Sequence, residues 1–273
     1  MNLTGEDLLN TDKDKETVNA ILARRNLKYT RGFCTKNLIF DMGSISPSGV
    51  LQLYKLLKRY SFRLYLREII KLRESFRTEF LLKFSGINTI ENYTRAALEI
   101  DIIEKTGIDG EYKLKRDYIE TFGDTLEWFV SRMMRFEFGS PSGWSIKLQT
   151  SGVGGDYDVL GLLENHLVYI ETKSSPPAHI DQSSIVEFVS RINTLAPQMA
   201  VFLVDTGLRM KDKIVPALEH VIHSFGIDCE MRNICGENFQ FNHSIYIINS
   251  RISLESNLRK VFADFILNRG LKL

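Results

Sequence analysis

The chain has 273 residues, of which 44% are hydrophobic, enough to bury the core of one large domain or two ordinary ones. Its formal net charge of +1 at pH 7 excludes a protein that is basic over its whole surface, so any nucleic-acid-binding surface must be local. Three cysteines are too few for a disulfide framework, and no apolar run approaches the roughly 18 residues of a membrane span. We therefore expect a cytoplasmic protein that does not enter a membrane.

The segment from Gly49 to about Leu98 has the periodicity of amphipathic helices, with apolar residues three and four positions apart. Between Lys55 and Lys83 it contains nine basic and three acidic residues, which is a local positive surplus. Residues 111–114 then have an extended pattern. Helices followed by a short ribbon resemble a winged helix-turn-helix, a module that presents one helix to a DNA groove. A helical region whose Lys and Arg stems cover a solvated face explains the same pattern.

The pattern changes from about residue 118 to alternating helices and strands. A hairpin is predicted in the middle of this region, with strands over 156–163 and 167–175 and a turn between them. The order of elements predicts an α/β fold in which helices cover a mixed sheet. The other predicted elements are helices over 121–139, 179–195, 211–226 and 253–270 and strands over 143–151, 198–206 and 244–250.

Asp158, Glu171 and Lys173 form the candidate catalytic site. Glu171 and Lys173 are two residues apart in a strand and share one face, and pairing within the hairpin brings Asp158 beside Glu171. Two neighbouring carboxylates repel unless a cation lies between them, and their oxygens suit Mg²⁺, with Mn²⁺ as a substitute. Burial and the metal would lower the pKa of Lys173, which could then orient or deprotonate a metal-bound water. An ordinary cross-strand ion pair is the alternative.

These residues carry a resemblance to a known superfamily. The sequence resembles the PD-(D/E)xK nucleases in the order of its motif residues. Gly154-Gly155 comes first, then Asp158, a short turn, and an apolar strand that ends in Glu171-Thr172-Lys173. The resemblance covers about residues 118–270 and implies the restriction-endonuclease-like fold. It also implies a metal-dependent nuclease in which Asp158 and Glu171 hold the metal and Lys173 positions the attacking water. DNA is the substrate that the resemblance favours over RNA.

Glu127 is a fourth candidate, on the helix predicted before the first strand. The segment from Gly123 to Val130 is similar to a pattern of the same superfamily, G-x-x-x-E followed by apolar residues, whose glutamate points into the site. Leu126 and Trp128 flank Glu127, and such neighbours are unusual for a solvated acid. The resemblance implies that Glu127 contacts the metal directly or through its bound ligands. An exposed glutamate of an amphipathic helix is the alternative.

The chain departs from the superfamily pattern at the proline that precedes the first acid. Gly155-Asp156-Tyr157-Asp158 stands there instead, which leaves two candidate acids. Asp158 has the better spacing to Glu171 and begins the apolar run, whereas Asp156 shares its strand face and could substitute for it. Gln182, early on the following helix, is a further polar residue that could face the site.

The sequence therefore predicts two domains. Residues 1–117 are expected to form a mostly helical, winged-helix-type region that binds nucleic acid, and residues 118–273 a nuclease-like domain that hydrolyses phosphodiester bonds. Two alternatives stay open: a non-catalytic DNA-binding or regulatory protein with a nuclease-like domain, and a nuclease that acts on RNA. A homodimer is compatible with this hypothesis because cutting both strands of a duplex requires two sites.

Overall fold

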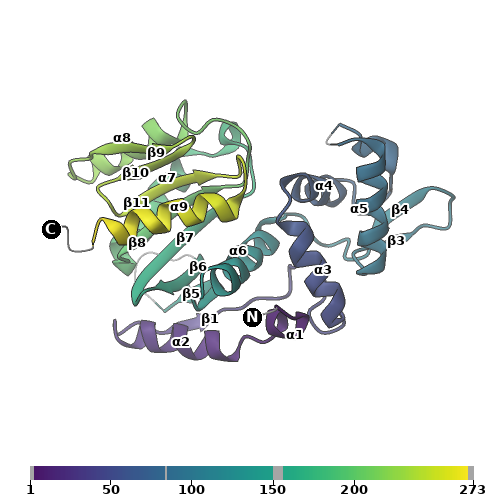
Figure 1. The fold of residues 1–273 in the computed structure, drawn as a ribbon, viewed down its shortest axis with the longest axis horizontal. Coiled ribbons are helices and arrows are strands. Elements are labelled where there is room, and N and C mark those ends of the chain that lie inside the picture. Colours follow the sequence, from purple (N-terminus) through teal and green to yellow (C-terminus); the bar gives the residue numbers. More distant parts are fainter. Residues whose placement is uncertain (1–2, 84, 150–155, 270–273) are drawn as a thin grey trace. The chain divides into compact units, whose positions relative to one another are not determined.

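The computed structural model describes residues 3–83, 85–149 and 156–269 and contains two compact units (Figure 1). The first comprises Met1–Thr11 and Cys34–Phe129, and the second comprises Asp12–Phe33 and Val130–Leu273. Helix α6 (Gly123–Glu137) therefore begins in the first unit and ends in the second. The two functional domains expected from the sequence remain a prediction. No helix among the described residues combines the length and apolarity that a membrane span requires.

The first unit is mostly helical, as the periodicity between residues 49 and 98 predicted. Ser46 caps the N-terminus of α3 by accepting a hydrogen bond from the backbone of Gly49, and Pro47 occupies the first turn. Residues 72–86 separate the second and third long helices, so the predicted helical run is interrupted there. The helices that lie wholly in this unit are α1 (Gly5–Leu9), α3 (Pro47–Leu57), α4 (Tyr60–Lys71) and α5 (Ile87–Glu99), with the short 3-10 helix η1 (Thr78–Leu81).

A small antiparallel sheet completes the described part of the first unit. Its strand order is β2-β4-β3, from β2 (Phe76–Arg77), β4 (Glu111–Leu114) and β3 (Ile103–Lys105). Strand β4 confirms the extended segment expected at residues 111–114. Gly107 and Gly110, with φ of 95° and 71°, form the turn between β3 and β4, where other residues would be strained. Along the chain the order is α4, β2, η1, α5, β3, β4.

The second unit is built on a mixed sheet, which has eight strands among the described residues, in the order β1-β5-β6-β7-β8-β11-β10-β9. Pairing is parallel between β7 and β8 and between β8 and β11, and it is antiparallel elsewhere. The strands are β1 (Tyr29–Arg31), β5 (Ser142–Leu148), β6 (Asp156–Leu163), β7 (His166–Lys173), β8 (Met199–Val204), β9 (Met231–Cys235), β10 (Asn238–Phe241) and β11 (Ile245–Asn249).

The predicted hairpin is confirmed as β6 and β7. Glu164 and Asn165 form its turn with φ of 47° and 65°, the conformation of a type I′ turn, whose twist suits the flanking strands. The register runs from Leu163 opposite His166 to Val159 opposite Ile170. This register determines which side chains meet at the open end of the hairpin.

Helices cover both faces of the sheet, as the sequence predicted. Phe188 of α7 packs against Tyr169 of β7 and Phe202 of β8 on one face. On the other face, Tyr246 of β11 donates a hydrogen bond to Asp264 of α9, which Figure 1 shows in yellow across the sheet. Strand β8 is buried along its whole length because both of its faces are covered. The helices wholly within this unit are α2 (Asp12–Ala23), α7 (Gln182–Leu195), α8 (Ile214–Ser224) and α9 (Leu254–Leu267), with the 3-10 helix η2 (Pro177–His179).

Candidate functional site

The candidate site lies where β6 and β7 separate. Their ladder ends at Val159 and Ile170, and the next residues are Asp158 on β6 and Glu171 on β7. Asp158 fills the opening between the strands, because its Oδ2 accepts hydrogen bonds from the backbone nitrogen of Thr172 at 2.7 Å and from the Thr172 hydroxyl at 3.0 Å. The side chain of Asp158 is thus fixed beside the strand that carries Glu171.

Glu171 is buried, with 1% of its surface exposed, and both of its carboxylate oxygens are paired. The Lys173 ammonium lies 2.8 Å from Oε1, and the Arg191 guanidinium donates to Oε2 at 2.8 Å. The Tyr169 hydroxyl also donates to Oε2. The burial of the Glu171 carboxyl group is therefore compensated by two cations and a phenol.

The site disfavours a second negative charge. Burial, followed by the charge of Glu171, raises the pKa of Asp158 to about 8, although hydrogen bonds from Thr172 and the charge of Lys173 act in the opposite direction. Burial and the same glutamate raise the pKa of Tyr169 well above its ordinary value, so this phenol stays a hydrogen-bond donor. A cation placed between Asp158 and Glu171 would relieve their repulsion.

Lys173 and Arg191 are both cations in this arrangement. Burial lowers the pKa of Lys173, as expected from the sequence, but the ion pair with Glu171 outweighs burial and the net shift is upward. The pKa of Arg191 is raised for the same reason, again against the effect of burial. As an ammonium group, Lys173 is suited to orienting a nucleophile and stabilising negative charge rather than to accepting a proton.

Arg191 and Tyr169 are the contributors that the sequence analysis missed. Arg191 lies on α7 three residues after Phe188, which packs on the sheet, so helical spacing turns both toward β7. Tyr169 is two residues before Glu171 and shares its strand face, a signal that was present in the sequence. Gln182 is exposed at the first position of α7, and within the described residues no contact joins it to Glu171.

Asp156 and Glu127 are the two remaining candidates. Asp156 forms an ion pair with Arg31 of β1 at 2.9 Å and lies opposite Lys147 of β5, so it already has basic neighbours of its own. Glu127 is half-buried in the part of α6 that belongs to the first unit. Its role at the site stays a prediction, as does the choice of Asp158 over Asp156.

The donor set at the strand ends fits a small divalent cation. Asp158 and Glu171 supply two carboxylates, the number that Mg²⁺ commonly takes from a protein while it keeps water or phosphate at its other positions. In the described ranges, no three side chains of the His, Cys, Asp and Glu types gather as a ligand cluster. Among the described residues, the argument for a divalent cation at this site therefore rests on the pair Asp158 and Glu171.

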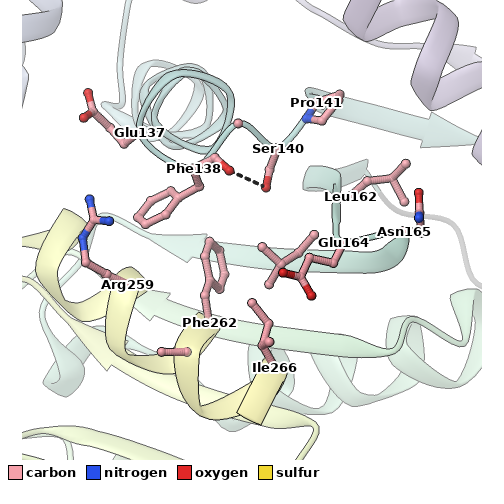
Figure 2. A pocket seen from close by; sticks show the side chains of 13 residues that line it. Glu137, Phe138, Ser140, Pro141, Leu162, Glu164, Asn165, Arg259, Phe262 and Ile266 are labelled. Carbon is pink, nitrogen blue, oxygen red and sulfur yellow. Dashed lines mark hydrogen bonds between the residues drawn. The ribbon is translucent and has the colours of Figure 1, made fainter. Parts of the chain in front are cut away.

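A cavity of about 620 Å³ occurs at the opposite end of the hairpin (Figure 2). Phe138, Leu162, Phe262 and Ile266 give it an apolar lining between the end of α6, the β6–β7 turn and α9. Asp158 is five residues along β6 from Leu163 at this turn, roughly 16 Å at the rise of an extended strand. The cavity is therefore separate from the acid–lysine site.

No protein-family model and no curated protein matches the chain. Several solved structures share its fold, including VC1899 and Can2. Protein VC1899 from Vibrio cholerae superposes with a TM-score of 0.54 at 14% identity, over 91% of this chain and 62% of that protein. Can2 from Sulfobacillus thermosulfidooxidans, solved in complex with cyclic tetra-adenylate, superposes with a TM-score of 0.52 at 15% identity, over 90% of this chain and 60% of Can2. The chain thus spans about three fifths of the length of either neighbour.

Proposed function

We propose that the chain is a metal-dependent nuclease of the PD-(D/E)xK type, with a restriction-endonuclease-like domain. The observation that carries the proposal is the meeting of Asp158, Glu171 and Lys173 where β6 and β7 separate. Two carboxylates and a lysine at one strand edge are the groups that hydrolysis of a phosphodiester by a metal-activated water requires. The mixed sheet flanked by helices supports the same assignment.

Each residue has a defined part in this proposal. Asp158 and Glu171 hold Mg²⁺ or Mn²⁺, which when bound lowers the pKa of a water and neutralises charge on the phosphate. Lys173 orients the attacking water and stabilises the negative charge that develops on the phosphate oxygens. Arg191 and Tyr169 hold the Glu171 carboxyl group in position through their hydrogen bonds to it. That Glu127 contributes a further metal contact stays a prediction from the sequence.

The first unit supports a nucleic-acid substrate. The order α4, β2, η1, α5, β3, β4, with β4 between β2 and β3 in the sheet, supports the winged helix that we propose for this unit. We propose DNA as the substrate, on the strength of the sequence resemblance, and RNA as the rival. Can2 binds cyclic tetra-adenylate, an oligonucleotide, which agrees with a nucleic-acid ligand for this chain.

A non-catalytic role in nucleic-acid binding or regulation is the second candidate. One observation favours it: both oxygens of Glu171 are already paired, with Lys173 on one side and Arg191 and Tyr169 on the other. Catalysis requires Glu171 to exchange one of these partners for the metal. A regulatory protein would keep the ion pairs permanently.

Cleavage assays separate these candidates. Supercoiled, linear and single-stranded DNA and an RNA of matched sequence are incubated with the protein at low salt in Mg²⁺, Mn²⁺ or EDTA. We expect cleavage of DNA that requires a divalent metal. Cleavage of RNA alone would move the substrate to RNA, and binding without cleavage in every metal would establish the regulatory alternative.

A further inference from the structure

Two loops leave the sheet beside the candidate catalytic lysine. Lys173 of β7, Val204 of β8 and Asn249 of β11 stand in one row across three parallel strands. The chain after β8 stays at this edge, since the backbone nitrogen of Asp205 donates to the Lys173 carbonyl at 2.8 Å. The chain after β11 follows it, with Ser250 donating to Thr206 at 2.8 Å. We call residues 206–213 and 250–253 the edge platform.

The edge platform exposes apolar side chains. Ile252 is 83% exposed and Leu208 is 57% exposed. Ile252 also has a φ of 78°, a left-handed conformation that is strained for a β-branched residue. The loops are nonetheless held in place, because Asn249 donates to the Leu208 carbonyl at 2.8 Å and Asn257 donates to the Arg251 carbonyl at 3.0 Å. Ile252 is thus exposed to solvent on a backbone that is held in place. Because its side chain is not buried, packing in the core does not explain its strained φ.

The same surface is basic. The two segments contain four basic residues and one acidic residue, Asp212. Arg209 is partly neutralised by Asp212 at 3.6 Å and Glu237 at 4.0 Å. Lys211 and Arg251 are exposed, and across the described ranges neither enters an ion pair. Exposed cations and exposed apolar side chains on the same two loops complement a ligand with an anionic backbone and apolar faces.

We propose that the edge platform binds the nucleic-acid strand to be cleaved, as an unpaired strand. Lys211 and Arg251 contact phosphates, while Ile252 and Leu208 pack against base faces, which are accessible only where the strand is unstacked or single. The position of Lys173 in the same row places the strand beside the acid–lysine site. This inference rests on the proposed nuclease function and specifies its substrate as single-stranded or locally unpaired nucleic acid.

The test measures binding in EDTA, where no cleavage competes. The fluorescence anisotropy of a short labelled DNA oligonucleotide is followed for its single-stranded and duplex forms over a range of salt concentrations. We expect tighter binding of the single strand. Ile252→Gly should weaken that binding roughly ten-fold, although glycine relieves the positive φ and should not weaken the fold. Arg251→Ala should reduce the salt dependence by about one counterion.

Matched controls come from the same unit. Leu267→Ser removes another exposed leucine, and Lys13→Ala removes an exposed lysine on α2. Both should bind as the wild type does. Equal binding by Ile252→Gly, Arg251→Ala and the wild type overturns the inference, as does equal affinity for the single strand and the duplex or no binding at all.

The outcomes also separate this inference from the nuclease itself. Binding that depends on Ile252 and Arg251, without cleavage in any metal, supports the edge platform and rejects the nuclease. Metal-dependent cleavage that neither substitution changes supports the nuclease and rejects the platform. If these apolar side chains instead contact another protein, nucleic-acid binding will not respond to Ile252→Gly.

Discussion

Glu68 in the first unit and Glu171 in the second are both carboxylates held between two basic side chains. Glu68 lies on α4, with Lys83 at 2.6 Å from one oxygen and Lys71 at 3.4 Å from the other. The lysine side chains are 59% and 71% exposed, so these pairs lie at the surface. The partners of Glu171, Lys173 and Arg191, are 24% and 12% exposed. Both glutamates are thus buried, but the cations around Glu68 are exposed to water whereas those around Glu171 are largely buried.

The second carboxylate distinguishes the two sites. Burial raises the pKa of Glu68, but its two lysines outweigh burial and the net shift is downward. At the strand edge, burial and Glu171 raise the pKa of Asp158 to about 8. The lysines of Glu68 more than offset the cost of burying its charge, as in a structural ion pair. The cations near Asp158 do not offset burial and the charge of Glu171. An acid between two bases is therefore not by itself a sign of a functional site, whereas a second carboxyl group with a raised pKa beside it marks a candidate site.

Some of the basic side chains between Lys55 and Lys83 are already engaged within the first unit. Lys71 and Lys83 neutralise Glu68. Arg63 is fully buried and donates to the Leu57 carbonyl. Part of the positive surplus therefore serves the packing of the first unit, and the number of basic residues overstates the charge available to nucleic acid.

The largest difference should come from neutralising each glutamate. Glu171→Gln should lower metal-dependent cleavage by about a thousand-fold or more, because the metal loses one of two carboxylates. Glu68→Gln should leave the rate unchanged. Initial rates on one DNA substrate measure both. An equal loss of cleavage rate in Glu171→Gln and Glu68→Gln would contradict a catalytic role for Glu171 and a structural role for Glu68.

Removing Arg191 should have a smaller effect. Arg191→Ala should slow cleavage at saturating Mg²⁺ by roughly 10- to 100-fold, since Glu171 loses the group that aligns it. Arg191→Lys should recover part of the rate because it restores charge without the planar fork. An Mg²⁺ titration of the rate distinguishes alignment from metal affinity. Arg259→Ala, at an exposed arginine on α9, is the control and should cleave normally.

Mg²⁺ should stabilise the protein through Asp158. A metal that binds only the folded state adds about 2.7 kcal/mol to the free energy of unfolding at a concentration one hundred times its Kd. The melting temperature should therefore rise with Mg²⁺, and Asp158→Asn should abolish most of the rise. A variant that is stabilised as much as the wild type would remove Asp158 from the metal site. The same measurement on Asp156→Asn tests the rival acid.

The smallest effect concerns pH and Glu68. Because its pKa is lowered in the folded protein, Glu68 stabilises the fold above its ordinary pKa of 4.5, and this contribution is lost as pH falls through the lowered value. Glu68→Gln should cost about 1 kcal/mol at pH 7 and nothing once the wild-type carboxyl is protonated. Chemical denaturation at several pH values measures the difference. A cost that does not change with pH would mean that packing, and not charge, is lost.

Much of the second unit could be predicted from the sequence because its strong signals are local. The apolar run of β8 and the turn at Glu164 and Asn165 predicted the central strands and their hairpin. Strands β1, β9 and β10 were missed. Each has five residues or fewer and is stabilised by pairing with a neighbour, which single-chain periodicity does not record.

The candidate site was predictable only where it lies on one hairpin. The period-two rule places Glu171 with Lys173, and pairing of the strands adds Asp158. Arg191 could not be assigned in the same way, because the packing of α7 on β7 determines which of its polar residues reaches Glu171. Ile252 has no sequence signal either, since its exposure and positive φ are properties of the folded loop.

The most direct test replaces one lysine of each ion pair. Cleavage of DNA in Mg²⁺ is measured for the wild type, for Lys173→Ala and for Lys71→Ala, with EDTA as the blank. The proposal predicts metal-dependent cleavage that Lys173→Ala abolishes and Lys71→Ala retains. Cleavage by Lys173→Ala at the wild-type rate would contradict the assignment of the strand edge as the active site.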